Sequence, residues 1–399
     1  AAICRSTLPA GLHLYVIDAR GDDGLTALSS LAHCGGVVRV TEDERMHRLL
    51  QRVVEVIDER MTDGGDDGPD IVVMIDGYAS VRNALGPIER QATFDLLQRV
   101  VNDGPAARVV VVIADDANSA VTMAPVAHRW LFHLDDRTGA RGLGLRTAPA
   151  PPGKPGRFRV LATGHEAQVA QGAAGLAEIP AHGEAEGGPE TIATLPEFVE
   201  ASTLPRDGPT AGGRRGVASL TVGRASTDLG VARLDVADGD HALIVGSPRT
   251  GVSTALARCA AAWEDDARRR GEPFEIIRIG RRTPLDPGAI VDPTVRVCVV
   301  ADDAHRIDDP GILAAIAKGE HAHVTIIAGG RADSIRGSYG HWTRELARAR
   351  CGIVMASRGE QDGDLLGVQI PRRSLVPARP GLAWLVDGGA LRQAQLAVG

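Results

Sequence analysis

Aromatic residues are scarce in this 399-residue chain, since Phe, Trp and Tyr together make up only 3% of it. The core must therefore be built from Val, Leu, Ile and Ala, within a hydrophobic share of 44% that is ordinary for a globular protein. Long apolar runs are missing as well. The run at residues 109–114 is far shorter than the ~18 residues that a membrane span needs. These absences exclude a membrane span in this chain.

Cysteine and positive charge are also limited. The five cysteines form no CxxC pair and are odd in number, which argues against a zinc motif and a disulfide framework and favours a cytosolic protein. The formal net charge of −7 gives no bulk argument for nucleic-acid binding. The first residues, Ala-Ala-Ile-Cys-Arg, include no methionine and do not have the pattern of a signal peptide. We therefore expect a fragment of a longer protein.

Short, β-branched apolar runs alternate with helical patterns along the chain. Strands are predicted at residues 12–17, 71–75, 109–113, 243–245, 274–279, 295–300 and 324–327. Helices are predicted at residues 44–60, 87–102, 254–270, 311–318 and 343–348. Such alternation is typical of an α/β fold with a mostly parallel sheet.

The order of these features repeats. The matching positions are Asp76 with Asp302, Pro155 with Pro380, and Gln168 with Gln395, which lie 226, 225 and 227 residues apart. Three concordant offsets predict two copies of one domain. The copies differ at the front, because only the second has a Gly-rich loop there. The loop of the first copy is expected upstream of residue 1, unless its front has diverged.

An Ala-, Gly-, Glu- and Pro-rich stretch separates the two copies. Its composition is typical of a linker. We predict a first domain at residues 1–175, a linker at 176–216 and a second domain at 217–399. A short amphipathic piece at residues 195–204 is expected to dock on a neighbouring domain.

The Gly-rich loop of the second copy follows a strand and precedes a helix, which is the context of a P-loop. Backbone N–H groups and the helix N-terminus there cradle phosphates. The candidate nucleotide-binding residues are Gly246, Ser247, Pro248, Arg249, Thr250, Gly251, Val252, Ser253 and Thr254. Ser253 stands where a hydroxyl would ligate Mg²⁺, whereas Val252 occupies the place of the phosphate-binding lysine. The alternative interpretation is a plain Gly-rich turn that caps a buried helix.

Two carboxylates, Asp302 and Asp303, follow the strand that is predicted at residues 295–300. Asp302 stands where a Walker B aspartate would hold Mg²⁺, and Asp303 where a neighbouring acid would orient the attacking water. The alternative role for such residues is a turn or a helix N-cap. In the first copy, Asp76 is followed by Gly77, so the second carboxylate is missing. Arg331, after the following strand, stands where a γ-phosphate-sensing group would lie, although an exposed surface arginine is the simpler interpretation.

Taken in combination, these residues resemble the FtsK/SpoIIIE family of P-loop motors, specifically its tandem-domain actinobacterial members related to type VII secretion coupling ATPases. The resemblance covers nearly the whole chain. Its segments in the first copy are residues 13–18, 31–38, 44–50 and 72–78. In the second copy they are residues 239–246, 303–306 and 362–371.

The resemblance implies two tandem RecA-like P-loop NTPase domains, the first truncated at its N-terminus. It further implies ATP and Mg²⁺ as cofactors, other motor subunits in a hexameric ring as partners, and a secreted protein as substrate. It places the chain at the cytoplasmic face, membrane-associated through segments outside it. Because Val252 departs from the family pattern, the second domain is expected to be regulatory or substrate-recognising, with negligible hydrolysis alone.

Two other functions stay open at this point. One is a double-stranded DNA translocase, although two motor copies in one chain are unusual for such a pump. The other is a non-enzymatic nucleotide-binding interaction module, which an intact P-loop lysine upstream would argue against.

Overall fold

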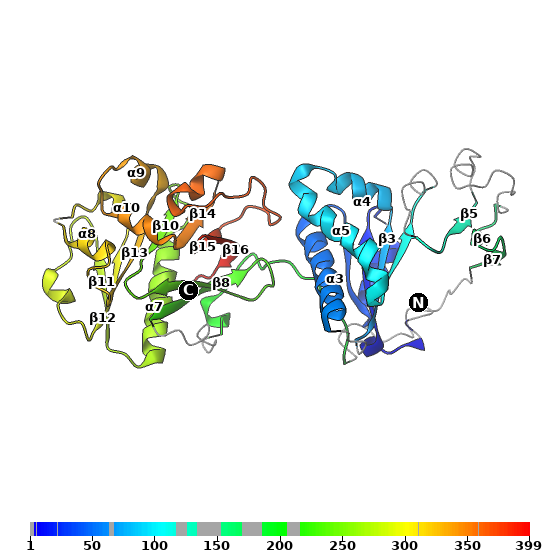
Figure 1. Ribbon diagram of the computed structural model, residues 1–399, viewed down its shortest axis with the longest axis horizontal. Helices are drawn as coiled ribbons and strands as arrows, with labels where there is room; N and C mark the ends of the chain where they lie inside the picture. Colours follow the sequence, from blue (N-terminus) through cyan, green and yellow to red (C-terminus); the bar gives the residue numbers. More distant parts are fainter. Residues whose placement is uncertain are drawn as a thin grey trace. The chain divides into compact units, whose positions relative to one another are not determined.

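The computed structural model describes residues 4, 6–21, 23–63, 68–116, 126–133, 153–169, 186–205, 216–309, 311–357 and 359–399. The chain divides into two compact units, Ala1–Ala193 and Thr194–Gly399 (Figure 1). Each unit combines helices with a sheet that contains parallel strands, so the expected α/β class is confirmed. The main sheet of the first unit is parallel, whereas that of the second is parallel in one half and antiparallel in the other, because the strands added around the parallel core pair as hairpins.

The first unit is built on a four-stranded parallel sheet of order β2-β1-β3-β4. Its strands are β1 (Leu12–Asp18), β2 (Cys34–Arg39), β3 (Asp70–Asp76) and β4 (Val109–Ala114). The helices that complete it are α2 (Asp23–Thr26), α3 (Asp43–Asp63), α4 (Tyr78–Leu85) and α5 (Gln91–Asp103). A separate antiparallel sheet contains β5 (Trp130–Phe132), β6 (Arg157–Val160) and β7 (Glu166–Gln168).

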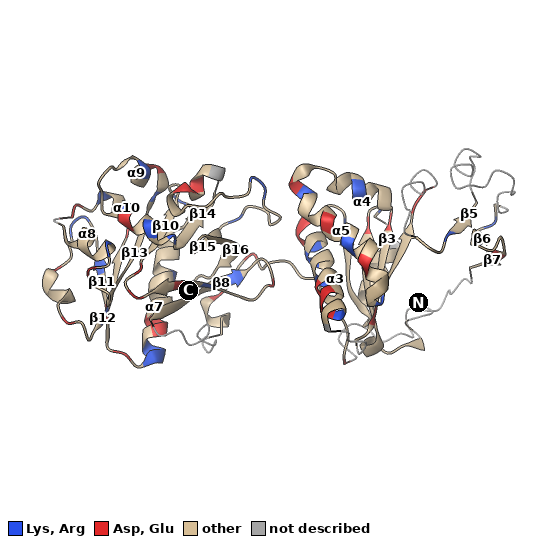
Figure 2. Cartoon of the chain, viewed as in Figure 1, with Lys and Arg blue, Asp and Glu red and all other residues tan. Residues whose placement is uncertain are grey.

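Helix α3 shows how the sequence directs this packing. Its apolar residues recur at intervals of three and four, so one stripe, including Leu49, Val53 and Ile57, is buried against the sheet. Acidic and basic residues occur along the length of the helix between these apolar positions (Figure 2). Asp43 and Glu44 lie in the first turn and Arg60 in the last, which suits the helix dipole.

The second unit contains one nine-stranded sheet of order β11-β12-β13-β10-β14-β15-β16-β8-β9. Its strands are β8 (Val217–Ala225), β9 (Val231–Ala237), β10 (Ala242–Gly246), β11 (Phe274–Ile279), β12 (Arg296–Ala301), β13 (Val324–Arg331), β14 (Gly352–Met355), β15 (Leu382–Asp387) and β16 (Ala390–Leu396). Strands β11 to β14 and β10 pair in parallel, and the others pair antiparallel. The helices are α7 (Val252–Arg270), α8 (Ile312–Ala317), α9 (Ala332–Gly337) and α10 (Thr343–Leu346).

The strand orders of the two units agree in part. Strands β3 and β4 are neighbours like β12 and β13. Strands β5-β6-β7 follow one another like β14-β15-β16, but they form a sheet of their own, whereas β14-β15-β16 belong to the main sheet. The fronts differ, because β2 and α3 have no counterpart between β11 and β12. Conversely, β4 is an edge strand among the described strands of the first unit, whereas its counterpart β13 has β10 as a second neighbour.

The exposure of β4 reflects this difference. Val110 and Val112 are 54% and 46% exposed, whereas Thr325 and Ile327, the residues of β13 that match them in register, are buried. Ile327 lies in the same core cluster as residues of α7. Strand β10 and helix α7 of the second unit thus cover a surface that stays open in the described part of the first.

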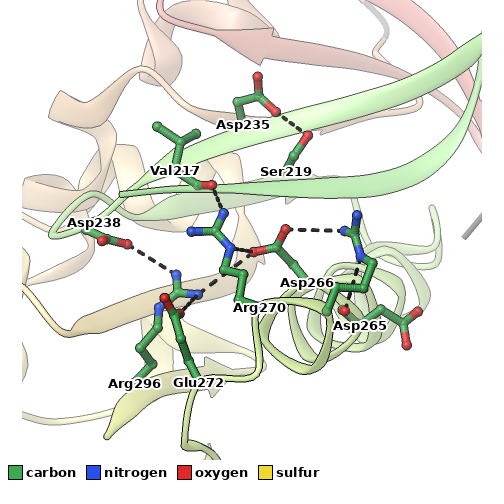
Figure 3. A network of polar contacts seen from close by, with 10 residues as sticks. Val217, Ser219, Asp235, Asp238, Asp265, Asp266, Arg270, Glu272 and Arg296 are labelled. Carbon is green, nitrogen blue, oxygen red and sulfur yellow. Dashed lines mark hydrogen bonds and ion pairs between the residues drawn. The ribbon is translucent and has the colours of Figure 1, made fainter. Parts of the chain in front are cut away.

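A buried polar network holds the carboxyl end of α7 (Figure 3). Asp266 is fully buried and forms ion pairs with Arg270 at 2.7 Å, Arg269 at 3.2 Å and Arg296 at 3.8 Å. Arg270 also donates to the carbonyl oxygen of Val217 on β8. Because Arg296 begins β12, one carboxylate connects the helix to two strands of the sheet.

Residues 186–205, which include the boundary between the two units, pack against the unit to which each part belongs. In the first unit, Ile192 is buried and its N–H donates to the carbonyl oxygen of Gly35 at 2.9 Å. In the second, Leu195 and Leu204 are buried in small apolar clusters. The predicted docking of residues 195–204 is therefore confirmed, although these residues are mostly extended, with one 3₁₀ turn at Ala201–Thr203.

Candidate functional site

The candidate residues of the second unit meet at the carboxyl ends of adjacent parallel strands, where ligands of open α/β sheets bind. Gly246, the last residue of β10, lies opposite Arg331 on β13 and Met355 on β14. Asp302 follows directly after β12, the other neighbour of β13. The fold thus brings the Gly-rich loop, Asp302 and Arg331 to one edge of the sheet.

The loop itself has the backbone geometry of an anion-binding turn. Arg249 and Gly251 have positive φ angles of 65° and 96°, and the hydroxyl of Thr250 donates to the carbonyl oxygen of Ser247 at 2.7 Å. The 19-residue helix α7 begins at the next residue and has no acidic side chain in its first turn. Positive-φ turns and helix N-termini both direct N–H groups at anions. The backbone therefore fits a phosphate group.

Glycine is required at the start of the loop because side chains approach it closely. A β-carbon at Gly246 would lie 2.6 Å from Oγ1 of Thr250 and 2.9 Å from the β-carbon of Met355. Any larger residue would push the loop away from the strand ends.

Val252, which stands where the phosphate-binding lysine is expected, packs against the strand ends. Its Cγ2 would lie 3.0 Å from a β-carbon at Gly246, and its Cγ1 3.0 Å from one at Gly329. The chain contains only two lysines, Lys154 and Lys318, and Lys318 follows α8, before β13 begins. No lysine among the described residues of the second unit can therefore replace the missing charge at the loop.

The two predicted carboxylates differ in their surroundings. Asp302 is exposed, its Oδ1 accepts the N–H of Asp303 at 2.9 Å, and the same oxygen would lie 3.6 Å from a β-carbon at Gly329. Asp303 is exposed and forms an ion pair with Arg306 at 3.4 Å. Its φ of 50° is left-handed, a conformation that non-glycine residues adopt at an energetic cost.

His305 is a residue of this edge to which sequence reasoning gave no separate role. Its Nδ1 is buried without a hydrogen-bond partner among the described residues and would lie 3.3 Å from a β-carbon at Gly330. Burial lowers the pKa of this imidazole, so it favours the neutral form. The sequence signals for it were its place two residues after Asp303 and its membership of residues 303–306, one of the segments that carry the family resemblance.

Asp76 occupies the matching place in the first unit, at the end of β3. Arg20 lies between Asp76 and Asp115, at 3.6 and 3.7 Å from their carboxylates. Asp18, at the end of β1, is 1% exposed and accepts the N–H groups of Arg20 and Gly21. Strands β1, β3 and β4 thus bring three carboxylates and one guanidinium to the carboxyl edge of this sheet.

The described ranges also lack two kinds of feature. No group of three or more His, Cys, Asp or Glu residues there is arranged to hold a metal ion. No described helix has both the length and the apolar character needed to cross a membrane.

Comparison with known proteins places the whole chain in one architecture. EssC (ATPases 2 and 3) from Geobacillus thermodenitrificans matches with a TM-score of 0.71 at 16% identity, over 100% of this chain and 87% of that one. EccC (ATPases 2 and 3) from Thermomonospora curvata, solved in complex with a signal sequence peptide, matches with a TM-score of 0.63 at 16% identity, over 98% and 83%. The cytoplasmic domain of the type VII secretion ATPase EccC from the same organism gives 0.62 at 17% identity, over 98% and 54%.

These similarities show that the chain has the fold of tandem ATPase domains 2 and 3 of EssC and EccC, which confirms the expected resemblance at the level of the fold. No protein-family profile matches the sequence, and no curated protein matches it.

Proposed function

We propose that this chain is part of an ATP-dependent motor that moves a polypeptide, as in type VII protein export. Its second unit is a degenerate member that binds nucleotide weakly and serves regulation or substrate recognition. The observation that supports this most directly is the phosphate loop at the head of α7, which keeps its anion-binding backbone although Val252 replaces the lysine. Backbone N–H groups can bind phosphate without the lysine, so we expect weak nucleotide binding to persist where hydrolysis is lost.

The residues at this edge fit a nucleotide with its Mg²⁺. The loop from Gly246 to Thr254 would hold the phosphates, while the hydroxyl of Ser253 and the carboxylate of Asp302 would hold the metal ion, which neutralises phosphate charge. Asp303 would orient water, but its short side chain and the uncharged Val252 leave little to stabilise a transition state. We therefore expect negligible turnover from the second unit.

A polypeptide suits this chain better than DNA. The EccC neighbour was solved with a signal sequence peptide, and a net charge of −7 does not favour contacts with a phosphate backbone. Assembly into a ring with other motor subunits, and attachment to the cytoplasmic face of a membrane through segments outside this chain, are parts of the same proposal.

A second candidate is a nucleotide-independent interaction module. The packing of Val252 between Gly246 and Gly329 favours it, because an apolar side chain there stabilises the loop without any ligand.

Nucleotide titration distinguishes the two candidates. We expect the purified chain to bind a fluorescent ATP analogue weakly and in a Mg²⁺-dependent manner. Val252→Lys should tighten binding by about 10- to 100-fold, the usual contribution of a charge-assisted hydrogen bond. Val252→Ala is the matched control, because it removes the same packing without adding charge.

The outcomes separate clearly. Binding that Ser253→Ala or Asp302→Asn weakens supports the proposal. If neither the wild type nor a folded Val252→Lys variant binds the ATP analogue, the loop is a structural turn and the second candidate function is supported. Phosphate release near ~1 s⁻¹, an ordinary enzymatic rate, abolished by Ser253→Ala would contradict the expected degeneracy.

A further inference from the structure

A cavity of about 510 Å³ lies beside the long helix of the second unit, away from the residues of the phosphate loop. One wall is a stripe of α7 and the other is the docked segment that precedes β8. The residues that matter here are Arg258, Ala262, Asp265 and Arg269 on α7, and Phe198 and Leu204 on the segment. The four helix residues recur at intervals of four, three and four, so they share one face. The volume falls within the ordinary range for small-ligand pockets.

The segment wall is fixed to the sheet. Glu200 pairs with Val398 in a parallel bridge, and the N–H of Ala201 donates to the carbonyl oxygen of Val398 at 3.0 Å. Leu204 is buried against Ala397. The space between this segment and α7 is therefore a built feature of the fold.

Arg258 is the unusual side chain of this cavity. It is only 10% exposed, and its Nε has no hydrogen-bond partner among the described residues. Its nearest recorded counter-ion is Asp265, at 3.7 Å, which is too long for a hydrogen bond. Burying an N–H donor without an acceptor is costly, and the Nε–H of Arg258 is such a donor. Among the described residues, none accepts a hydrogen bond from this guanidinium.

The other charged side chains of the lining supply no acceptor to Arg258. Arg269 is itself a cation, and its guanidinium donates to the carbonyl oxygen of Asp265 at 3.3 Å and to the carboxylate of Asp266 at 3.2 Å. Glu200 is exposed, and its carboxylate accepts the hydroxyl of Ser202 at 3.3 Å. The side chain of Asp265 is 52% exposed, so water screens its attraction for Arg258. Phe198, 64% exposed at this cavity, adds an apolar surface.

We propose that this cavity binds a carboxylate on an apolar stem, with the carboxylate accepting hydrogen bonds from Arg258 and the stem lying against Phe198, Leu204 and Ala262. A carboxylate accepts from a guanidinium in a two-pronged geometry, which makes it the group that best matches the donors of Arg258. Either an acidic side chain of a polypeptide or a small carboxylic acid carries this chemistry. The proposal does not depend on nucleotide binding.

Ligand-observed NMR titration of the full chain with hexanoate tests it. We expect saturable binding with a dissociation constant on the order of 1 mM, as suits a ligand of this size. Hexanol and hexylammonium, which keep the stem but lack the carboxylate, should bind at least ~10-fold more weakly. Arg258→Gln should weaken hexanoate binding by at least ~10-fold. The matched control is Arg268→Gln, on the same helix but 61% exposed and outside the cavity lining, which should bind like the wild type.

Unchanged hexanoate binding in a folded Arg258→Gln variant, equal binding of hexanol, or no saturable binding by the wild type would each overturn the proposal. Two capped peptides then identify the source of the carboxylate, one with the sequence Ala-Leu-Glu-Leu-Ala and one with Gln in place of Glu. Tighter binding of the Glu peptide than of hexanoate assigns the site to a polypeptide. Binding of hexanoate alone assigns it to a small acid.

Discussion

Replacing Asp266 by asparagine is expected to destabilise the second unit by about 3 kcal/mol. The carboxylate is fully buried and is shared by Arg270 and Arg296, whose side chains are 16% and 13% exposed. Removing one partner of a buried ion pair leaves uncompensated charge and destabilises a protein by about 3–5 kcal/mol. The lower value applies here because Arg296 also pairs with Asp238 at 3.2 Å and with Glu272 at 3.1 Å.

This loss is large for a unit of roughly 200 residues. It corresponds to a decrease of about 6–12 °C in melting temperature. Tryptophan fluorescence is a suitable probe, because three of the four tryptophans, Trp263, Trp342 and Trp384, belong to the second unit. Trp263 lies within the network, with the guanidinium of Arg296 5.2 Å from its ring centre.

Asp265→Asn is the matched control, since it removes the same charge one residue earlier on the same helix. Its side chain is 52% exposed and lies 3.7 Å from Arg258, so its loss should change stability by less than about 1 kcal/mol. If Asp266→Asn and Asp265→Asn shifted the urea midpoint equally, the reasoning from burial would be refuted.

Two further predictions concern His241 and Asp303. His241 is buried, with Nε2 against the carbonyl oxygen of Ile316 and Nδ1 accepting the N–H of Ile326. Burial lowers the pKa of His241 in the folded state from its ordinary value of about 6.5. Below pH 6.5 the unfolded chain therefore binds a proton that the folded state does not, and the free energy of unfolding decreases as the pH falls toward the folded-state pKa. The expected loss at pH 5.5 is up to about 1.4 kcal/mol. Urea midpoints at pH 7.5 and 5.5 measure this, and an unchanged pH slope in His241→Gln would contradict it. Asp303→Gly should stabilise the second unit by about 1 kcal/mol, because it relieves the left-handed φ of 50°, and a lower melting temperature for this variant would count against strain there.

Several features of the fold were predictable from local patterns. Helix α7 was expected at 254–270 and spans Val252–Arg270, and β11 was expected at its observed bounds. Strong periodicity and β-branched runs specify such elements without tertiary help. The repeat offsets likewise anticipated the partial match of the strand orders. The boundaries at 175 and 216 stay predictions.

Other features were missed because their sequences carry weak signals. Strands β8, β9 and β14 to β16 complete the large sheet, but their short or mixed patterns did not distinguish them from loops. The α4 helix was missed for the same reason. The candidate site was partly foreseen, since a Gly-rich loop and an Asp at a strand end are readable, whereas the buried Nδ1 of His305 is not.

The sequence by itself determined the α/β class, the presence of two related units and the absence of a lysine from the Gly-rich loop, because periodicity, offsets and residue identity are properties of the chain alone. Tertiary structure decided which strand ends meet, that Val252 fills the space between Gly246 and Gly329, and that Arg258 lies buried beside a cavity. These depend on contacts between residues far apart in the chain. The neighbours that pack around a side chain decide whether it is buried and hydrogen-bonded, and the local sequence does not identify those neighbours.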